Sequence, residues 1–138
     1  MKHIFFIDTN VFLRFLIPDK TNPILSKQAK EIFSQISSDK IKVIANHLII
    51  SEVVYTLESY YKLTKNEISE KLTILFSNDN ILIRKKGLIL KSLLVFSEKN
   101  VDFEDAYTYL KMKENGIENI FTFDQKHFRR FDDINIVS

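Results

Sequence analysis

His3-Ile4-Phe5-Phe6-Ile7-Asp8-Thr9-Asn10 contains a short apolar run that ends abruptly in a carboxylate. A run that is apolar at every position, with β-branched and aromatic members, predicts a strand covered on both faces, as in a parallel sheet between helices. Asp8 then stands at the carboxyl end of the strand, where ligands bind in open α/β sheets. The alternative is a plain turn followed by a helix cap, and these residues alone do not decide between the two.

The composition is that of an ordinary globular chain. Its 138 residues are 45% hydrophobic and 28% charged, so we expect a single domain over residues 1–138. With only two glycines and two prolines, the chain offers no linker and no glycine-rich phosphate loop. It has no cysteine, which excludes disulfides, thiolate zinc sites and thiol nucleophiles. A net charge of +2 is too small to indicate nucleic acid by itself.

No targeting or membrane segment is expected. The apolar run behind Met1-Lys2-His3 is too short for a signal peptide. The stretch from Leu88 to Phe96 is interrupted by Lys91 and Ser92 and is too short for a membrane span. We therefore expect a cytoplasmic protein that makes no membrane contact.

Strand and helix patterns alternate along the chain. Further strands are predicted at residues 42–45, 81–83, 119–123 and 134–137. The predicted helices start after Asn10, at Asn22-Pro23, after Asn46, at the Thr64–Glu67 capping box, at Lys86 and after Asp102. This alternation implies right-handed crossovers and an α/β fold, in which a mostly parallel sheet has helices on both faces.

Glu52 is the one charge in a helix whose other side chains are apolar over most of its circumference. A carboxylate buried there without a partner would cost several kcal/mol, so we expect Glu52 to have a partner, such as a metal ion. The alternative is a surface glutamate opposite Ile50 that extends its carboxylate into water.

Three more aspartates stand at the ends of predicted elements. Asp102 is predicted to cap a helix, and Asp105 lies in its first turn, where the helix dipole alone favours an acid. Asp124 directly follows the run from Asn119 to Phe123, which repeats the pattern of the first strand.

We expect Asp8, Glu52, Asp105 and Asp124 to form one cluster. Carboxylates held close together repel each other, so the arrangement is costly unless a cation keeps them ionised. Oxygen ligands without His or Cys favour Mg²⁺ or Mn²⁺ over zinc. Such a site can clamp a phosphodiester and generate hydroxide from bound water. The cluster therefore predicts hydrolysis of nucleic acid.

Four segments in this order resemble the PIN-domain nucleases, and within them the VapC-type toxins of toxin–antitoxin pairs. They are Asp8-Thr9-Asn10-Val11-Phe12-Leu13-Arg14, Ser51-Glu52-Val53-Val54-Tyr55-Thr56-Leu57, Val101-Asp102-Phe103-Glu104-Asp105-Ala106 and Thr122-Phe123-Asp124-Gln125-Lys126-His127-Phe128. The resemblance implies a PIN-like three-layer fold with a central, mostly parallel sheet flanked by helices.

The same resemblance assigns roles by position. It makes the metal site from Asp8, Glu52, Asp105 and Asp124, with Thr9, Asn10 and Thr122 as orienting neighbours. In this interpretation Asp102 is a cap and not a ligand, and Asp124 acts on the metal either directly or through water.

The resemblance also implies an activity and its partners. The chain would be an endoribonuclease dependent on Mg²⁺ or Mn²⁺ and the toxin of a toxin–antitoxin pair. Its partners would be RNA as substrate, a cognate antitoxin protein and a second copy of itself in a homodimer.

Two other classes of protein remain open. A receiver-like or phosphatase-like phosphoryl-transfer domain also places an aspartate at a strand end. A receiver would need a further acidic pair near the first strand, and a haloacid-type phosphatase would need a second aspartate where Asn10 stands. A non-catalytic RNA-binding protein of PIN-like fold is the other alternative. His3, His47, His127 and Ser51 match no nucleophile pattern and receive no role.

Overall fold

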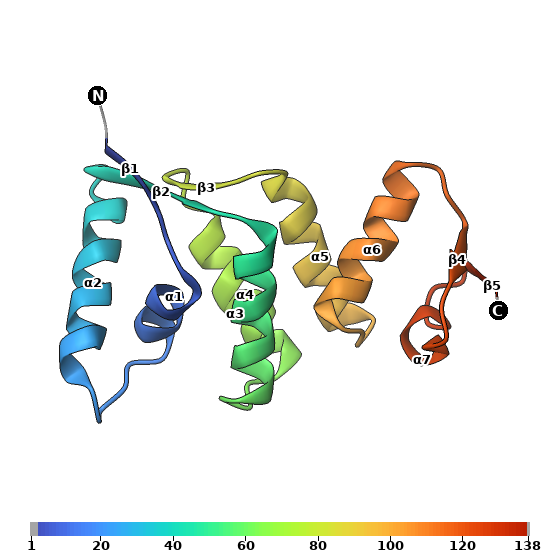
Figure 1. Ribbon diagram of the computed structural model, residues 1–138, viewed down its shortest axis with the longest axis horizontal. Helices are drawn as coiled ribbons and strands as arrows, with labels where there is room; N and C mark the ends of the chain where they lie inside the picture. The colour runs from blue at the N-terminus through green and yellow to red at the C-terminus, as the bar shows by residue number, and fades with distance from the viewer. Residues whose placement is uncertain (1–2, 138) are drawn as a thin grey trace.

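The computed structural model describes residues 3–137 and shows an elongated α/β arrangement (Figure 1). The described residues do not include Met1, Lys2 and Ser138. The two ends of the expected domain over residues 1–138 therefore lie outside the described part of the chain. The strands are β1 (His3–Phe6), β2 (Ile41–Ala45), β3 (Ile81–Ile83), β4 (Asn119–Phe121) and β5 (Asn135–Val137). The helices are α1 (Thr9–Leu16), α2 (Pro23–Ser37), α3 (His47–Ser59), α4 (Lys65–Phe76), α5 (Lys86–Glu98), α6 (Phe103–Glu114) and α7 (Gln125–Phe128).

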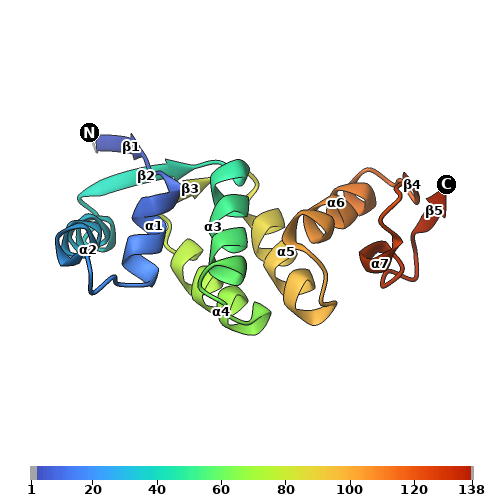
Figure 2. The ribbon, with the colours of Figure 1, turned by 60° about the horizontal axis from the view of Figure 1, so that its bottom comes forward.

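The strands form two parallel sheets. The first has the order β1-β2-β3, with His3 opposite Ile41 and Val43 opposite Ile81. The second pairs β4 with β5, with Asn119 opposite Asn135. In both views the two sheets lie apart, with α5 and α6 between them (Figure 1, Figure 2). The predicted α/β class with parallel pairing and flanking helices is confirmed. Within residues 3–137 no helix has the length and apolar character needed to cross a membrane.

The core lies between one face of the first sheet and the helices packed against it. Alternate strand residues point into it because successive side chains of a strand face opposite sides. The buried strand residues are Val43, Ala45, Ile81 and Ile83, and the largest fully buried helix residues include Phe12, Ile50, Leu57, Leu72, Phe76 and Phe96. The rings of Phe12 and Phe76 meet edge to face at 5.8 Å, so this cluster fixes α1 and α4 together beneath the sheet.

The prediction that the first strand is covered on both faces is wrong. Ile4, Phe5 and Phe6 of β1 are 56%, 51% and 74% exposed. A continuous apolar run indicates that a strand can be covered, but it does not say which elements lie over it. β1 stands at the edge of its sheet, so it lacks a neighbour on one side.

Most of the helix caps predicted from the sequence form in the structure, but the cap of the first helix is a different residue. Asn22, Asn46 and the Thr64–Glu67 capping box cap their helices as predicted. The first helix begins two residues earlier than expected: α1 starts at Thr9, and its N-cap is Asp8 and not Asn10. Asp8 can take this position because an aspartate caps a helix about as well as an asparagine.

The capping box of α4 gives a stability prediction. Thr64 Oγ1 accepts from the Glu67 amide at 3.1 Å, so Thr64→Ala leaves that amide without its partner. We expect Thr64→Ala to lower the free energy of unfolding by about 1 kcal/mol, measured by urea denaturation. The control is Thr73→Ala, an exposed threonine inside the same helix, which should change stability little because alanine favours a helix interior. An equal loss for both variants would contradict the capping role.

Candidate active site

Asp8 and Glu52 are connected through Thr9. The Asp8 carboxylate accepts from the Thr9 amide at 2.8 Å, as a cap at the start of α1. The buried Thr9 side chain then donates from Oγ1 to Glu52 Oε2 at 3.1 Å. Thr9 therefore contacts both acids, and its role in orienting them at a metal site stays a prediction.

Glu52 lies on the exposed side of α3. Leu48 and Tyr55, one turn before it and about one turn after it, are 69% and 65% exposed, and the Glu52 side chain is itself exposed. Glu52 is thus the surface glutamate of the alternative interpretation and not a buried carboxylate, because the apolar side chains of α3 include this solvent-facing stripe. The expected partner exists, and it is the Thr9 hydroxyl.

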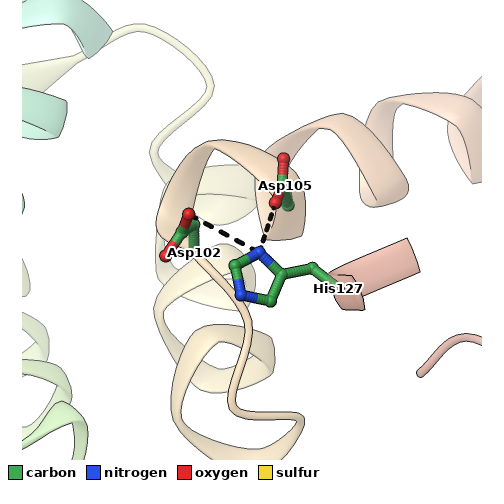
Figure 3. A group of neighbouring side chains, drawn as sticks. All are labelled: Asp102, Asp105 and His127. Atoms are coloured by element: carbon green, nitrogen blue, oxygen red, sulfur yellow. Dashed lines mark hydrogen bonds and ion pairs between the residues drawn. The ribbon is translucent and has the colours of Figure 1, made fainter. Parts of the chain in front are cut away.

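A second acidic group forms around His127 (Figure 3). His127 Nδ1 lies 2.8 Å from Asp105 Oδ2 and 3.5 Å from Asp102 Oδ2. One ligand atom from each of the three residues lies within 4.8 Å of the others. Asp102 occupies the N-cap position of α6 but makes no side-chain capping bond. The predicted cap is thus right in position and wrong in contact, because the Asp102 carboxylate faces the imidazole instead of the helix amides.

Asp105 is held in a mixed electrostatic environment. Burial raises the pKa of its carboxyl above the ordinary value, and the hydrogen bond and charge of His127 act in the opposite direction. The charges of Asp102 and Asp124 raise the pKa further. Asp124 therefore lies within electrostatic reach of Asp105, although the group whose ligand atoms lie together is Asp102, Asp105 and His127.

Asp124 is positioned by its own loop. Its carboxylate accepts from the Lys126 amide at 3.3 Å at the start of α7. Its amide donates to Thr122 Oγ1 at 3.0 Å, so Thr122 acts on Asp124 through the backbone. Asn10, the other predicted neighbour, is exposed at the start of α1, and within residues 3–137 its side chain hydrogen-bonds to none of the four acids.

The two acidic groups lie on contacting helices but do not touch. Ser51 Oγ donates to Glu104 Oε1 between α3 and α6, and the rings of His47 and Tyr107 stack at 6.0 Å. Glu52 and Asp105 are the next residues along these helices. In the described part of the chain, however, no hydrogen bond or ion pair joins Asp8 or Glu52 to Asp105 or Asp124. In this structure Thr9 links Asp8 to Glu52, and Asp105 lies with Asp102 and His127. The single cluster of four acids stays a prediction.

Sequence reasoning missed His127 as a neighbour of the site. The available signal was its position three residues after Asp124, about one helical turn along α7. No residue-type pattern pointed to it, because the histidine contacts Asp105, which is 22 positions earlier in the chain.

The donor atoms of the proposed ligands have the chemistry that a divalent cation prefers, and the described residues placed to share one ion are Asp102, Asp105 and His127. The proposed ligands Asp8, Glu52, Asp105 and Asp124 offer only carboxylate oxygens, which suit Mg²⁺ and Mn²⁺. Burial is the main cause that raises the pKa of Asp105, and the negative charges of Asp102 and Asp124 add to it. A bound cation would neutralise this repulsion.

Comparison with known proteins agrees with the α/β fold described above. A sequence model of the PIN domain matches residues 5–134. A VapC ribonuclease of Aquifex aeolicus (strain VF5) is 24% identical over 120 residues, which cover 87% of each chain. The match supports neither the receiver-like nor the phosphatase-like alternative, and the chain belongs to the PIN domain family.

Proposed function

We propose that this protein is an endoribonuclease dependent on Mg²⁺ or Mn²⁺, and that it acts in the cytoplasm as the toxin of a toxin–antitoxin pair. The observation that carries the proposal is the Thr9 link between Asp8 and Glu52. Glu52 lies on α3, which packs against α6, the helix that carries Asp105. The PIN domain match and the similarity to a VapC ribonuclease support the same activity.

In this proposal each residue has a defined task. Asp8, Glu52, Asp105 and Asp124 hold the cation, and Thr9 keeps the Glu52 carboxylate in place through its hydroxyl. His127 orients Asp105 through the 2.8 Å contact with Nδ1. When bound, the metal supplies charge stabilisation at the phosphate and a water activated for attack on phosphorus.

The test of the proposal is a cleavage assay with purified protein on total RNA. Chelation with excess EDTA should abolish cleavage, and added Mg²⁺ or Mn²⁺ should restore it. The products should carry a 5′-phosphate, because the attacking water joins phosphorus as the 3′-oxygen leaves. Full activity in excess chelator, or a 2′,3′-cyclic phosphate product, would contradict the metal mechanism. No cleavage under any metal condition would favour the non-catalytic RNA-binding alternative.

The Thr9 hydroxyl offers a finer test of how the site is oriented. Thr9→Val keeps the shape of the buried side chain and removes the donor to Glu52. We expect cleavage to fall by about 10- to 100-fold, because groups that orient metal ligands typically contribute that much. Thr9→Ser retains the hydroxyl and should stay close to the unaltered protein. Equal loss in both variants would indicate a packing role for Thr9 instead.

A further inference from the structure

A basic pocket lies at the sheet edge that carries Asp8 and has no task in the proposed mechanism. Its volume is about 450 Å³, and it is lined by Asn46, His47, Arg84, Lys85, Tyr107 and Lys111. Asn46 follows β2 and Arg84 follows β3, at the carboxyl ends of parallel strands. Asp8 follows β1 at the same edge, which is the edge where ligands bind in open α/β sheets.

The charges of the basic pocket are not balanced. Lys85 and Lys111 share one carboxylate, because their ammonium groups lie 2.9 Å and 3.3 Å from the same oxygen of Glu114. Arg84 is exposed, and within residues 3–137 its side chain makes no hydrogen bond or ion pair. Three cations against one carboxylate leave an excess of two positive charges. A concave surface with such an excess attracts phosphate groups.

Two aromatic rings form one wall of the basic pocket. The rings of His47 and Tyr107 are nearly parallel, with an interplanar angle of 6° and centroids 6.0 Å apart. His47 is exposed and Tyr107 is half-buried, so the histidine is the outer ring of the pair. Proteins that bind single-stranded nucleic acid combine cations, which contact phosphates, with aromatic rings, which stack on bases. The basic pocket offers both kinds of group.

The basic pocket adjoins the acidic residues along the contact between α3 and α6. Ser51 Oγ donates to Glu104 Oε1 across this contact. His47 precedes Ser51 by four residues and Tyr107 follows Glu104 by three, so each lies on the same helix face as the hydrogen-bonded residue. The lining residues on α6 lie within about two turns of Asp105. A short stretch of bound RNA can therefore reach both the pocket and the acids.

We propose that the basic pocket binds the RNA strand next to the phosphodiester that is cleaved, a step that rests on the proposed ribonuclease function. Arg84, Lys85 and Lys111 contact phosphate oxygens, and the His47 ring stacks on a base. The acids hold the cation at the cleaved phosphodiester while the pocket holds a neighbouring nucleotide, so the strand is fixed at two points. Single-stranded RNA is the preferred substrate, because a base must leave its own stack to lie against a protein ring.

RNA binding without metal tests the basic pocket separately from cleavage. Binding of a fluorescent single-stranded RNA oligonucleotide is measured by anisotropy in EDTA at a series of salt concentrations. Arg84→Gln should weaken binding and reduce the slope of log K against log salt by about 0.7, which is the contribution of one phosphate contact on a single strand. The matched control is Lys30→Gln, which removes the same charge from an exposed position on α2, at the opposite end of the molecule from α6 (Figure 1). It should change affinity and slope little.

Two substitutions of His47 test the stacking. His47→Ala should weaken RNA binding by about 5- to 100-fold, as for the loss of one stacked base. The salt slope should stay the same, because no phosphate contact is lost. His47→Phe keeps an aromatic ring and should bind RNA about as well as the unaltered protein. Equal loss in the two His47 variants, or full binding by both His47→Ala and Arg84→Gln, would overturn the proposal.

Cleavage and competition distinguish the remaining outcomes. With Mg²⁺ present, Arg84→Gln and His47→Ala should raise KM and change kcat little, because the pocket binds substrate and transition state alike. If the protein binds RNA through the pocket and cleaves none, the ribonuclease function fails and the binding proposal stands. If it cleaves RNA and these variants bind and cleave like the unaltered protein, the binding proposal fails alone. Displacement of the RNA by a similar concentration of 5′-AMP would indicate a small nucleotide ligand and overturn the proposal.

Discussion

Asp8→Asn is expected to reduce RNA cleavage by about 100- to 1,000-fold, because a bound metal contributes several kcal/mol of charge stabilisation to phosphodiester hydrolysis. The substitution keeps the size of the side chain and deletes one ligand charge. Asparagine caps a helix about as well as aspartate, so the start of α1 at Thr9 should be preserved. We therefore expect Asp8→Asn to lose RNA cleavage and to keep its fold.

Stability measurements separate the lost ligand from a damaged fold. Without metal, the melting temperature of Asp8→Asn should equal or exceed that of the unaltered protein, because one source of repulsion between carboxylates is gone. The rise in melting temperature on adding Mg²⁺ or Mn²⁺ should shrink, because a ligand that binds only the folded state stabilises it by mass action. A variant that is inactive but keeps the full metal-induced rise would show that Asp8 is not a ligand.

Asp102→Asn is the matched control in the second acidic group. Asp102 and Asp105 both approach His127, but the Asp102 side chain is 55% exposed and only Asp105 is assigned to the metal. We expect Asp105→Asn and Glu52→Gln to behave like Asp8→Asn, and Asp102→Asn to lose less than about tenfold, as for a group outside the ligands. An inactive Asp102→Asn beside a fully active Asp105→Asn would reverse the roles of the two aspartates.

Local sequence signals predicted the elements well, because each depends on neighbours a few positions away. The Thr64–Glu67 capping box and the Asn46 cap rely on a side chain that reaches an amide three residues along, and both form as predicted. The acids Asp8 and Asp124 likewise stand just past their strands, as the abrupt change from apolar to charged residues indicated.

The features that sequence reasoning missed all depend on contacts between distant segments. An apolar run does not reveal that β1 lies at an edge with Phe6 exposed. The position of Asp102 before α6 predicts a helix cap, but its carboxylate lies near His127 of α7 and makes no capping hydrogen bond. The sequence predicts that Asp8 and Glu52 meet Asp105 and Asp124, but in the described residues no hydrogen bond or ion pair joins them. Such a meeting depends on how α6 and β4 lie relative to β1, and no local pattern encodes that placement.

Expression of the unaltered chain by itself is expected to arrest growth, and expression together with the product of its immediate genomic neighbour is expected to relieve the arrest. The first effect follows from an unregulated ribonuclease, and the second from the proposed toxin role, which requires a silencing partner. The Asp8→Asn chain should be harmless in the same host at the same expression level. Growth, complex formation on a sizing column and RNA cleavage are measured on the same set of strains.

The exposed acidic surface indicates how such a partner would bind. Carboxylates that hold no metal form strong, charge-assisted hydrogen bonds with arginine or lysine, so a basic side chain of the antitoxin would occupy the position of the metal and the phosphate. Leu48 and Tyr55 flank Glu52 on the open side of α3, and an apolar helix of the partner would gain contact area by lying along them. The basic anchor and the apolar helix would then cover the site together.

An antitoxin variant without its basic side chain distinguishes the contact with the carboxylates from the contact made by the apolar helix. This altered antitoxin should no longer relieve growth arrest, whereas Leu48→Ser together with Tyr55→Ser in the toxin should weaken the complex and leave RNA cleavage unchanged. Relief by the anchorless neighbour would show that silencing does not act through the carboxylates. Harmless expression of a demonstrably active enzyme, with no complex formed by the neighbour, would contradict the toxin role. It would leave the proposed ribonuclease activity standing, because that proposal rests on the acids of this chain and not on an antitoxin.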